Sequence, residues 1–511
     1  MNGLAIRTMW DVWENAVGKW PRKAAAVWRG ERQSYAELDR TVARLSTRFA
    51  RDLGLSKGDR LAIAAPNCIE FYLTYWSAMR LGVVLVPVNT RLKPDTMAFI
   101  IEESGARALV VHKDLAGTIA GIREKLTLVE KFITIDHTSP GALPFESLLE
   151  AVESPVAPCD SLRGDDVAVI VYTSGTTGVP KGPLITHGNL LYNIKNTIIP
   201  HGFRHEDVHM LVVPLFHCTG LNSIITTSAY LGSTVVIVPY PNVKELVSLI
   251  ERHRVTTFLG VPTLFHFVTA MKELGKYDLT SLRLIAYSGS PMATGTIGRL
   301  RERFPGVRLH NFFGLTETIS ITHVLADCDA DSRPDSIGKV LPDVGQKIID
   351  EDGREVPTGT IGELCFHRSE IVREYWKRPG LLEESMVGEW FRSGDFALVD
   401  EEGYVYLKGR KKEMIIVGGE NVYALEVESV LLSHEKVLEA AVVGVEATGA
   451  RTYLGELVKA VVVPGDKSLT EAELKRFCSE KLSSYQMPQV VEFRDSLPRT
   501  PSGKVMKSEL K

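Results

Sequence analysis

Residues 172–182 read YTSGTTGVPKG and directly follow VAVIV at 167–171. The β-branched run predicts a buried strand. The loop combines two flexible glycines, four hydroxyls, a proline and one cation: Gly175, Gly178, Thr173, Ser174, Thr176, Thr177, Pro180 and Lys181. Glycine lets successive N–H groups face one concavity that suits an anion, and the hydroxyls and ammonium add donors. The loop therefore predicts a nucleotide-phosphate site, although such a loop alone could also be a structural turn. It is not a Walker A loop, because the Gly-x4-Gly-Lys-Ser/Thr spacing is missing.

On both sides of this loop, runs rich in β-branched residues alternate with amphipathic stretches. The strand-like runs lie at 60–66, 83–88, 106–112, 131–136, 208–214, 233–239, 256–262 and 282–288. The helix-like stretches lie at 37–52, 69–81, 243–254 and 293–304. This alternation predicts an α/β fold of mostly parallel sheets with covering helices.

From about residue 335 the pattern changes to short strands separated by turns, including DG at 352–353 and EG at 402–403. These pairs suit tight hairpins and indicate a β-rich subdomain. A further pattern then predicts a small α+β domain, with helices at 424–433 and 470–482 and strands at 437–445, 456–463 and 489–493. We expect an N-terminal domain over 1–409, a hinge at 410–412 and a C-terminal domain over 413–511.

Composition excludes several classes of protein. The chain has 511 residues, 44% of them hydrophobic and 24% charged, and a net charge of −4, which argues against a general binder of nucleic acid or anionic membrane. No signal peptide is evident, and the apolar region 208–241 is interrupted by Pro and Gly. Six scattered cysteines form no CxxC pair, which disfavours a zinc or redox motif. We expect a cytoplasmic enzyme with no integral membrane association.

Five further runs contain residues suited to nucleotide chemistry. In NFFGLTETIS (311–320), Glu317 is a candidate Mg²⁺ contact, and the alternative is a helix start capped by Thr316. In 390–410, Asp395 could accept both ribose hydroxyls or simply cap a turn. The paired glycines of VGGENVYALEVE (417–428) permit close backbone approach or form a strand-to-helix turn. In LPRTPSGKVMK (497–507) Pro and Gly shape a turn that presents Lys504, and in PLFHCTGLN (214–222) Phe216 and His217 indicate a pocket edge.

Taken together and in order, these runs resemble the acyl-adenylate-forming superfamily of acyl-CoA synthetases, peptide-synthetase adenylation domains and beetle luciferases. The resemblance extends from SYAELDR (34–40) through KGDRLAIAAPN (57–67) and PVNTRL (87–92) to the Lys504 loop. It implies a large N-terminal domain of two α/β subdomains and a β-rich subdomain, with a small mobile α+β C-terminal domain. It also implies two half-reactions, in which a carboxylate attacks the α-phosphate of Mg·ATP and a thiol, usually coenzyme A, then displaces AMP.

The resemblance also implies roles for individual residues. The 172–182 loop holds the β- and γ-phosphates, Thr316 donates to the α-phosphate, and Glu317 and Thr176 contact Mg²⁺. The adenine and ribose site comprises Ser288, Gly289, Ser290, Pro291, Asn311, Phe312, Phe313, Gly314, Asp395 and Arg410. Lys504 bridges the substrate carboxylate and the α-phosphate, where a cation lowers the repulsion between two anions. Lys412 is the hinge, and rotation there brings Gly418, Gly419 and Glu420 to a coenzyme A tunnel.

Three departures from the family pattern are Ser393 for Thr, Phe313 for Tyr and Lys412 for Asp. The first keeps the hydroxyl, the second keeps the stacking face, and the third also occurs within the family.

The acyl pocket is expected around Phe216, His217, Leu221, Leu315 and Ser288–Pro291. These runs contain no Arg or Lys, so a hydrophobic acid is expected: a medium- to long-chain fatty acid first, an aromatic acid second. Because no carrier domain follows Lys504, a free-standing acyl-CoA synthetase is the first hypothesis. A stand-alone adenylating enzyme that loads an acyl carrier protein is the second, and a nucleotide-binding protein without turnover the third. The sequence is compatible with a homodimer and does not decide the oligomeric state.

Overall fold

The computed structural model describes residues 6–173, 179–240, 242–289, 292–499 and 505–511. The N-terminal part contains a sheet of seven strands, parallel except at the β8–β9 edge. Its spatial order is β7 (Leu143–Pro144), β6 (Lys131–Ile135), β5 (Ala108–His112), β3 (Arg60–Ala64), β4 (Val84–Pro87), β8 (Val167–Ile170) and β9 (Leu184–Thr186). Strands β3, β4 and β5 are buried along almost their whole length, as near-continuous apolar runs of parallel strands require.

A second sheet of nine strands is parallel in its centre and antiparallel at both edges. Its order is β16 (Lys339–Val340), β15 (Ile321–Leu325), β14 (Arg308–Gly314), β13 (Leu284–Tyr287), β12 (Thr257–Gly260), β10 (Val208–Leu211), β11 (Thr234–Ile237), β1 (Ala24–Trp28) and β2 (Glu31–Ser34). The hairpin β1–β2 comes from the start of the chain, so a segment far away in sequence completes this sheet.

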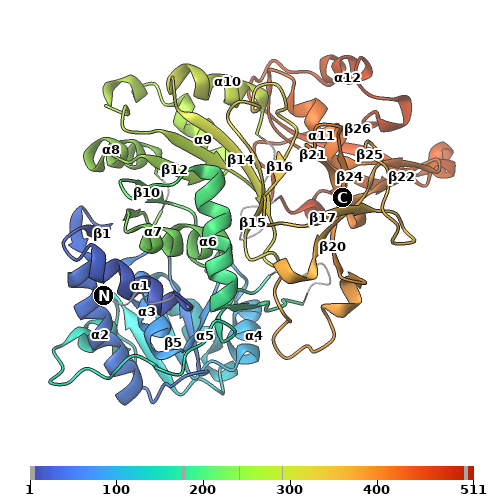
Figure 1. Cartoon of the computed structure of the whole chain (residues 1–511). Coiled ribbons are helices and arrows are strands. Elements are labelled where there is room, and N and C mark those ends of the chain that lie inside the picture. Colours follow the sequence, from blue (N-terminus) through green and yellow to red (C-terminus); the bar gives the residue numbers. More distant parts are fainter. Residues whose placement is uncertain (1–5, 174–178, 241, 290–291, 500–504) are drawn as a thin grey trace.

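Helices cover both sheets, and Figure 1 shows α6 standing between them. They are α1 (Met9–Lys19), α2 (Tyr35–Arg51), α3 (Ile69–Leu81), α4 (Pro94–Ser104), α5 (Ala116–Ile122), α6 (His187–His201), α7 (Thr226–Leu231), α8 (Val243–His253), α9 (Pro262–Ala270) and α10 (Thr294–Arg303). A π-helical segment, η4 (Thr219–Ile225), precedes α7. The alternation of strands and helices predicted from the sequence is confirmed.

The remaining strands form an antiparallel subdomain and a small α+β domain. The subdomain contains β17 (Gln346–Ile349), β18 (Gly362–His367), β20 (Trp390–Val399), β19 (Met386–Val387) and β21 (Val405–Arg410). After η8 (Lys411–Glu413) come the hairpin β22 (Ile415–Val417) and β23 (Glu420–Val422), then α11 (Ala424–Leu432), β24 (Val437–Glu446), β25 (Glu456–Pro464), α12 (Glu471–Ser479) and β26 (Val490–Phe493). In Figure 1 this red C-terminal part lies beside the β14–β16 edge, away from α1 and α2. The predicted fold class is confirmed.

Asn67 joins the two large sheets where their strands end. It follows β3, is only 3% exposed, and its Nδ2 donates to the carbonyls of Leu211 (3.2 Å), Val213 (3.0 Å) and Val238 (3.2 Å). Its Oδ1 accepts from the backbone N–H of Leu215 at 2.8 Å. One buried amide therefore fixes the carboxyl ends of both sheets and the start of the 214–222 segment.

Candidate active site

A cavity of ≈ 1660 Å³ lies where the ends of the sheets, the β-rich subdomain and the C-terminal domain meet. It collects most of the described residues predicted for the site, although they are spread over more than two hundred positions. These are Thr173, Lys181, Phe216, His217, Ser288, Gly289, Asn311, Phe312, Phe313, Gly314, Leu315, Thr316, Glu317, Asp395, Arg410 and Lys412. Ligand sites in α/β proteins characteristically lie at the carboxyl ends of strands.

Four predicted residues do not line this cavity. Leu221 is completely buried in η4, and Gly418, Gly419 and Glu420 lie at the surface of the C-terminal domain. Seven other predicted residues lie outside the described ranges: Ser174, Gly175, Thr176, Thr177, Ser290, Pro291 and Lys504.

The paired glycines form a different turn from the strand-to-helix alternative raised by the sequence. Gly418 and Gly419 have φ of 59° and 92° and connect β22 to β23 as the two central residues of a hairpin. Both positions need φ > 0, as in a type I′ turn, so glycine is required there. The helix α11 begins only after β23.

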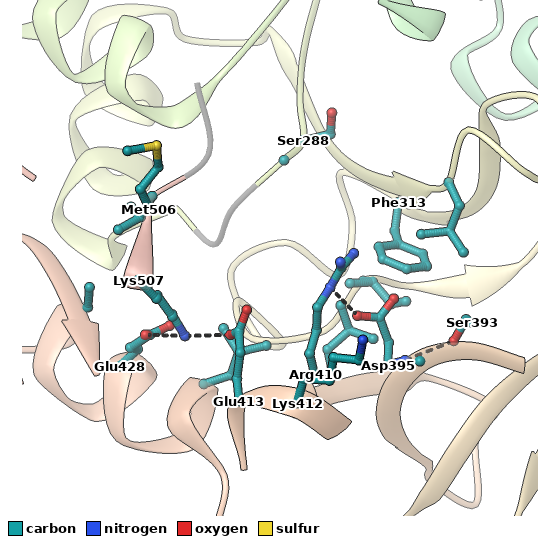
Figure 2. Close-up of a pocket in the computed structure, with 18 of the residues that line it drawn as sticks. Ser288, Phe313, Ser393, Asp395, Arg410, Lys412, Glu413, Glu428, Met506 and Lys507 are labelled. Atoms are coloured by element: carbon teal, nitrogen blue, oxygen red, sulfur yellow. Dashed lines mark hydrogen bonds and ion pairs between the residues drawn. The ribbon is translucent and has the colours of Figure 1, made fainter. Parts of the chain in front are cut away.

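Asp395 and Arg410 form a pair across neighbouring strands. They are register partners in β20 and β21, and Arg410 Nε lies 3.1 Å from Asp395 Oδ1 (Figure 2). Ser393 Oγ accepts from the Asp395 backbone N–H at 3.1 Å and donates to the Leu364 carbonyl at 2.6 Å. The Asp395 carboxylate is 6% exposed at the cavity wall, so it is fixed in position and suited to accept vicinal hydroxyls.

Thr316 and Glu317 lie on a tight turn between β14 and β15. The turn is closed by a hydrogen bond from Ile319 N to Thr316 O at 3.0 Å, and it is not helical. The alternative of a helix capped by Thr316 is therefore wrong, because β14 and β15 pair antiparallel on both sides of the turn.

Tyr375 orients Glu317, a contact that the sequence analysis missed. Its hydroxyl donates to Glu317 Oε1 at 2.8 Å, and Lys181 Nζ lies 5.4 Å from its ring centroid. Burial, and then the neighbouring carboxylate, raise the pKa of Tyr375, so its hydroxyl remains a donor. Tyr375 therefore joins the carboxylate expected at the metal to the cation of the 172–182 loop. A Tyr 58 positions along the chain gives no local signal of this contact.

The base of the 172–182 loop is closed by backbone hydrogen bonds. Thr173 N donates to Lys181 O at 2.8 Å and Lys181 N to Thr173 O at 3.2 Å. The loop therefore leaves β8 and returns at one fixed place beside Glu317 and Tyr375.

Phe313 and Ser288 both line the cavity and come from neighbouring parallel strands (Figure 2). Phe313 lies in β14, and Ser288 follows the end of β13. The half-buried Phe313 ring meets His323 edge-on, with ring centroids 5.9 Å apart. The contact helps to hold the ring at the cavity wall, where an aromatic face can stack on a flat base.

A buried charge cluster lies beside the predicted hinge. Lys507 Nζ lies 2.8 Å from both Glu413 Oε2 and Glu428 Oε1, and Figure 2 shows it between them. Burial raises the pKa of Glu428, and its Oε1 also accepts from Val442 N at 2.7 Å. Burial lowers the pKa of Lys507, but the two carboxylates more than offset this, so its pKa is raised overall. The cluster anchors the segment after residue 504 to the hinge, and nothing in the local sequence indicated it.

The segments on both sides of the Lys504 loop face the cavity. Arg499, Val505 and Met506 line it together with Thr316 and Asp395. Arg499 Nη2 lies 2.6 Å from Glu439 Oε1 and 3.4 Å from Thr263 Oγ1 of α9. The C-terminal domain thus presents these flanking residues, and not the 418–420 hairpin, to the cavity.

The chain matches the AMP-binding enzyme family over residues 13–376 and the C-terminal domain of AMP-binding enzymes over 426–504. The first match alone covers more than half of the sequence. The chain belongs to the AMP-binding enzyme family. It is therefore a member of the AMP-forming acid–CoA ligase superfamily, which confirms the predicted enzyme class.

This AMP-binding enzyme is 32% identical to a long-chain-fatty-acid–CoA ligase of Escherichia coli O6:H1, over 100% of the chain and 95% of that protein. It is also 32% identical to a feruloyl-CoA synthase of an Amycolatopsis species, over 97% of the chain and 98% of that protein. Its structure matches an o-succinylbenzoate CoA synthetase of Bacillus subtilis in complex with ATP and magnesium, with a TM-score of 0.84, 28% identity and 99% coverage of both chains. Relatives of this family thus include ligases of different acids.

Within the part of the chain that the structure describes, no helix is both long and apolar enough to span a membrane.

Proposed function

We propose that this AMP-binding enzyme is an acyl-CoA synthetase that activates a hydrophobic carboxylic acid as acyl-AMP, releases pyrophosphate and transfers the acyl group to coenzyme A. One observation carries the proposal: a single cavity holds Thr316, Glu317, Asp395, Arg410 and the segments that flank Lys504. These residues supply hydrogen-bond donors, two carboxylates and cations around one cavity that is large enough for a nucleotide and an acyl group.

In the first half-reaction, Asp395 and Arg410 hold the ribose, and Phe313 offers a face for adenine. Thr316 donates to the α-phosphate oxygen, while Lys181 and the rest of the 172–182 loop hold the departing pyrophosphate. Lys504 neutralises the acid's carboxylate and the α-phosphate as they approach, where a preorganised charge lowers the barrier most.

Magnesium fits the residues present. Mg²⁺ is usually bound by one or two carboxylates together with substrate phosphates. Glu317, held in place by Tyr375, supplies such a carboxylate facing the cavity. Bound there, the ion would neutralise developing phosphate charge, and Tyr375 would keep Glu317 aimed at it.

The second half-reaction requires the C-terminal domain to turn at Lys412. In the present arrangement Arg499, Val505 and Met506, which flank the Lys504 loop, line the cavity, and the 418–420 hairpin lies at the surface, which suits adenylation. Rotation of the C-terminal domain at the hinge would move the residues that flank the Lys504 loop away from the cavity and bring the 418–420 hairpin to it, so that the thiol of coenzyme A could enter.

Acid-dependent ATP–pyrophosphate exchange, followed by AMP release with and without coenzyme A, tests this function. We expect exchange without coenzyme A, and a CoA thioester when it is added. Exchange without any thioester would instead favour the second candidate, an enzyme that loads an acyl carrier protein. ATP binding without exchange for any acid would contradict both.

A further inference from the structure

Two small hydroxyl residues, Thr219 and Ser320, line the cavity beside Leu315, on the side where the acyl group is expected. Ser320 lies against the expected adenylate site, because a Cβ added to Gly314 would lie only 1.5 Å from the Ser320 carbonyl oxygen. A group held by Ser320 would therefore be close to the reacting carboxylate.

Behind Ser320 lies a directed chain of hydrogen bonds. Asn193 Nδ2 donates to Ser223 Oγ at 3.3 Å, and Ser223 Oγ donates to Ser320 Oγ at 2.8 Å. The Asn193 amide NH₂ can only donate, so Ser223 Oγ accepts from it and keeps its own proton for Ser320 Oγ. Ser320 Oγ is thus an acceptor toward the interior, and among the described residues its own proton has no recorded acceptor. That proton is available to the cavity.

The backbone beside Ser320 is strained and held in place. Ile319 has φ of 67°, a conformation that a β-branched residue rarely adopts. Asn222 Nδ2 donates to its carbonyl at 2.8 Å, and Asn193 Nδ2 donates to the Asn222 carbonyl at 2.8 Å. The same two buried amides therefore fix both the turn and the hydroxyl that it presents.

Buried side chains also fill the space behind Ser320. Asn193, Asn222 and Ser223 are at most 3% exposed and fill the space between α6, η4 and the start of β15. Leu221 and Ile321 beside them are equally buried. A long alkyl chain entering here would have to break the hydrogen bonds to Ser320 and Ile319 and would lie against amide groups, an unfavourable surface for hydrocarbon.

We propose that Ser320 is a specificity-determining residue that donates a hydrogen bond to an oxygen on the acyl group. This role of Ser320 rests on the proposed function and narrows the class of acid that the enzyme activates. The substrate class is a compact carboxylic acid with a hydroxyl, alkoxy or keto oxygen, such as an oxygen-substituted aromatic acid, and not the plain fatty acid favoured by the sequence.

The test uses ATP–pyrophosphate exchange with the full chain. This assay measures which acids are adenylated and does not need coenzyme A. The probes are benzoic and cinnamic acids, their mono-hydroxy and mono-methoxy derivatives, octanoic acid and dodecanoic acid. We expect kcat/KM to be highest for one oxygen-substituted acid and about tenfold lower for its unsubstituted parent, as loss of one well-placed hydrogen bond implies.

Ser320→Ala is expected to remove this preference, lowering kcat/KM about tenfold for the oxygenated acid while leaving the parent acid within about twofold. Ser223→Ala removes a residue that positions Ser320. It should lower the ratio of kcat/KM for the oxygenated acid to kcat/KM for its parent acid, but by less than Ser320→Ala does. Ser228→Ala is the matched control, since Ser228 in α7 is also buried but its hydroxyl donates to Ile225 O at the end of η4.

Three results would overturn the proposal in distinguishable ways. A best substrate among the fatty acids, or an unchanged ratio in Ser320→Ala, contradicts the role of Ser320 alone. No exchange with any acid contradicts the adenylation on which it rests.

Discussion

The N-terminal wall of the cavity and the C-terminal domain facing it are built in opposite ways. The wall is fixed by buried hydrogen bonds, such as the four made by the Asn67 amide across two sheets. The facing domain meets the wall through partly exposed polar pairs, such as Thr263–Glu439 and Ser429–Asp335. Buried networks are costly to break, whereas exposed pairs contribute little each. The N-terminal wall is therefore held together more firmly than the C-terminal domain is held against it.

Substitutions on the two sides of the cavity should affect the two half-reactions differently, and this is where we expect the greatest loss of activity. Lys504→Ala, on the C-terminal side, should lower adenylation by about 10²–10³ because a charge at the reacting phosphate is lost. Thioester formation from supplied acyl-adenylate should be spared. Asp395→Ala, on the fixed side, should impair both, because the ribose is held throughout. Single-turnover assays of each half-reaction would show this, and equal loss of both in Lys504→Ala would contradict alternation.

The next effect concerns the stability of the fixed wall. Asn67→Ala should lower the free energy of unfolding by about 3 kcal/mol, because three carbonyls and one N–H lose their partner in the interior. Urea denaturation of the full chain measures it. Asn242→Ala is a suitable control, since that residue only caps the exposed start of α8, and it should cost about 1 kcal/mol. Equal losses in the two variants would contradict the special role of Asn67.

Low pH should also lower the stability of the N-terminal part that forms the fixed wall of the cavity. Burial lowers the pKa of His209 to about 4, and its ring is hydrogen-bonded to Thr257 and Ser233. The unfolded chain binds the proton below about pH 6.5 and the folded chain does not, so stability is lost as pH falls from 6.5 toward 4. We expect a loss of about 2–3 kcal/mol from this residue over that range.

Urea denaturation at pH 7.5 and pH 4.5 measures this loss. His209→Asn should reduce the difference in unfolding free energy between the two pH values, whereas His137→Asn, at a half-buried position after β6, should leave it unchanged. An unaltered pH dependence in His209→Asn would show that other groups carry the acid sensitivity.

The smallest effect lies at the domain contact. Glu439 accepts from Thr263 Oγ1 of the N-terminal domain and holds Arg499 beside the same threonine, so Glu439→Gln weakens this contact and should disfavour the present domain arrangement by about 0.5–1 kcal/mol. Adenylation should fall about two- to fivefold, with thioester formation from supplied acyl-adenylate unchanged. Glu471→Gln is the control, because its pair with Lys475 lies within α12. A fall in both half-reactions would mean that Glu439 acts on folding instead.

The same contrast explains what the sequence could predict. Strands such as β3 and β5 were predictable because a buried parallel strand is a continuous run of apolar residues in the sequence. Residues of the site were predictable where glycine, hydroxyl and charged residues cluster within a few positions, as around Thr316 and Asp395. The Glu317–Tyr375, Lys507–Glu428 and Asn193–Ser223 contacts were not, because each joins distant segments and depends on the fold alone.

The close approach of Gly314 to the Ser320 carbonyl has a practical consequence for redesign of this enzyme. Any side chain at 314 would collide with backbone, so a saturation library at that position would yield mostly misfolded clones. Positions 219 and 320 present side chains to the cavity without such a collision. Libraries that seek new acids should therefore hold 314 constant and diversify 219 and 320 jointly.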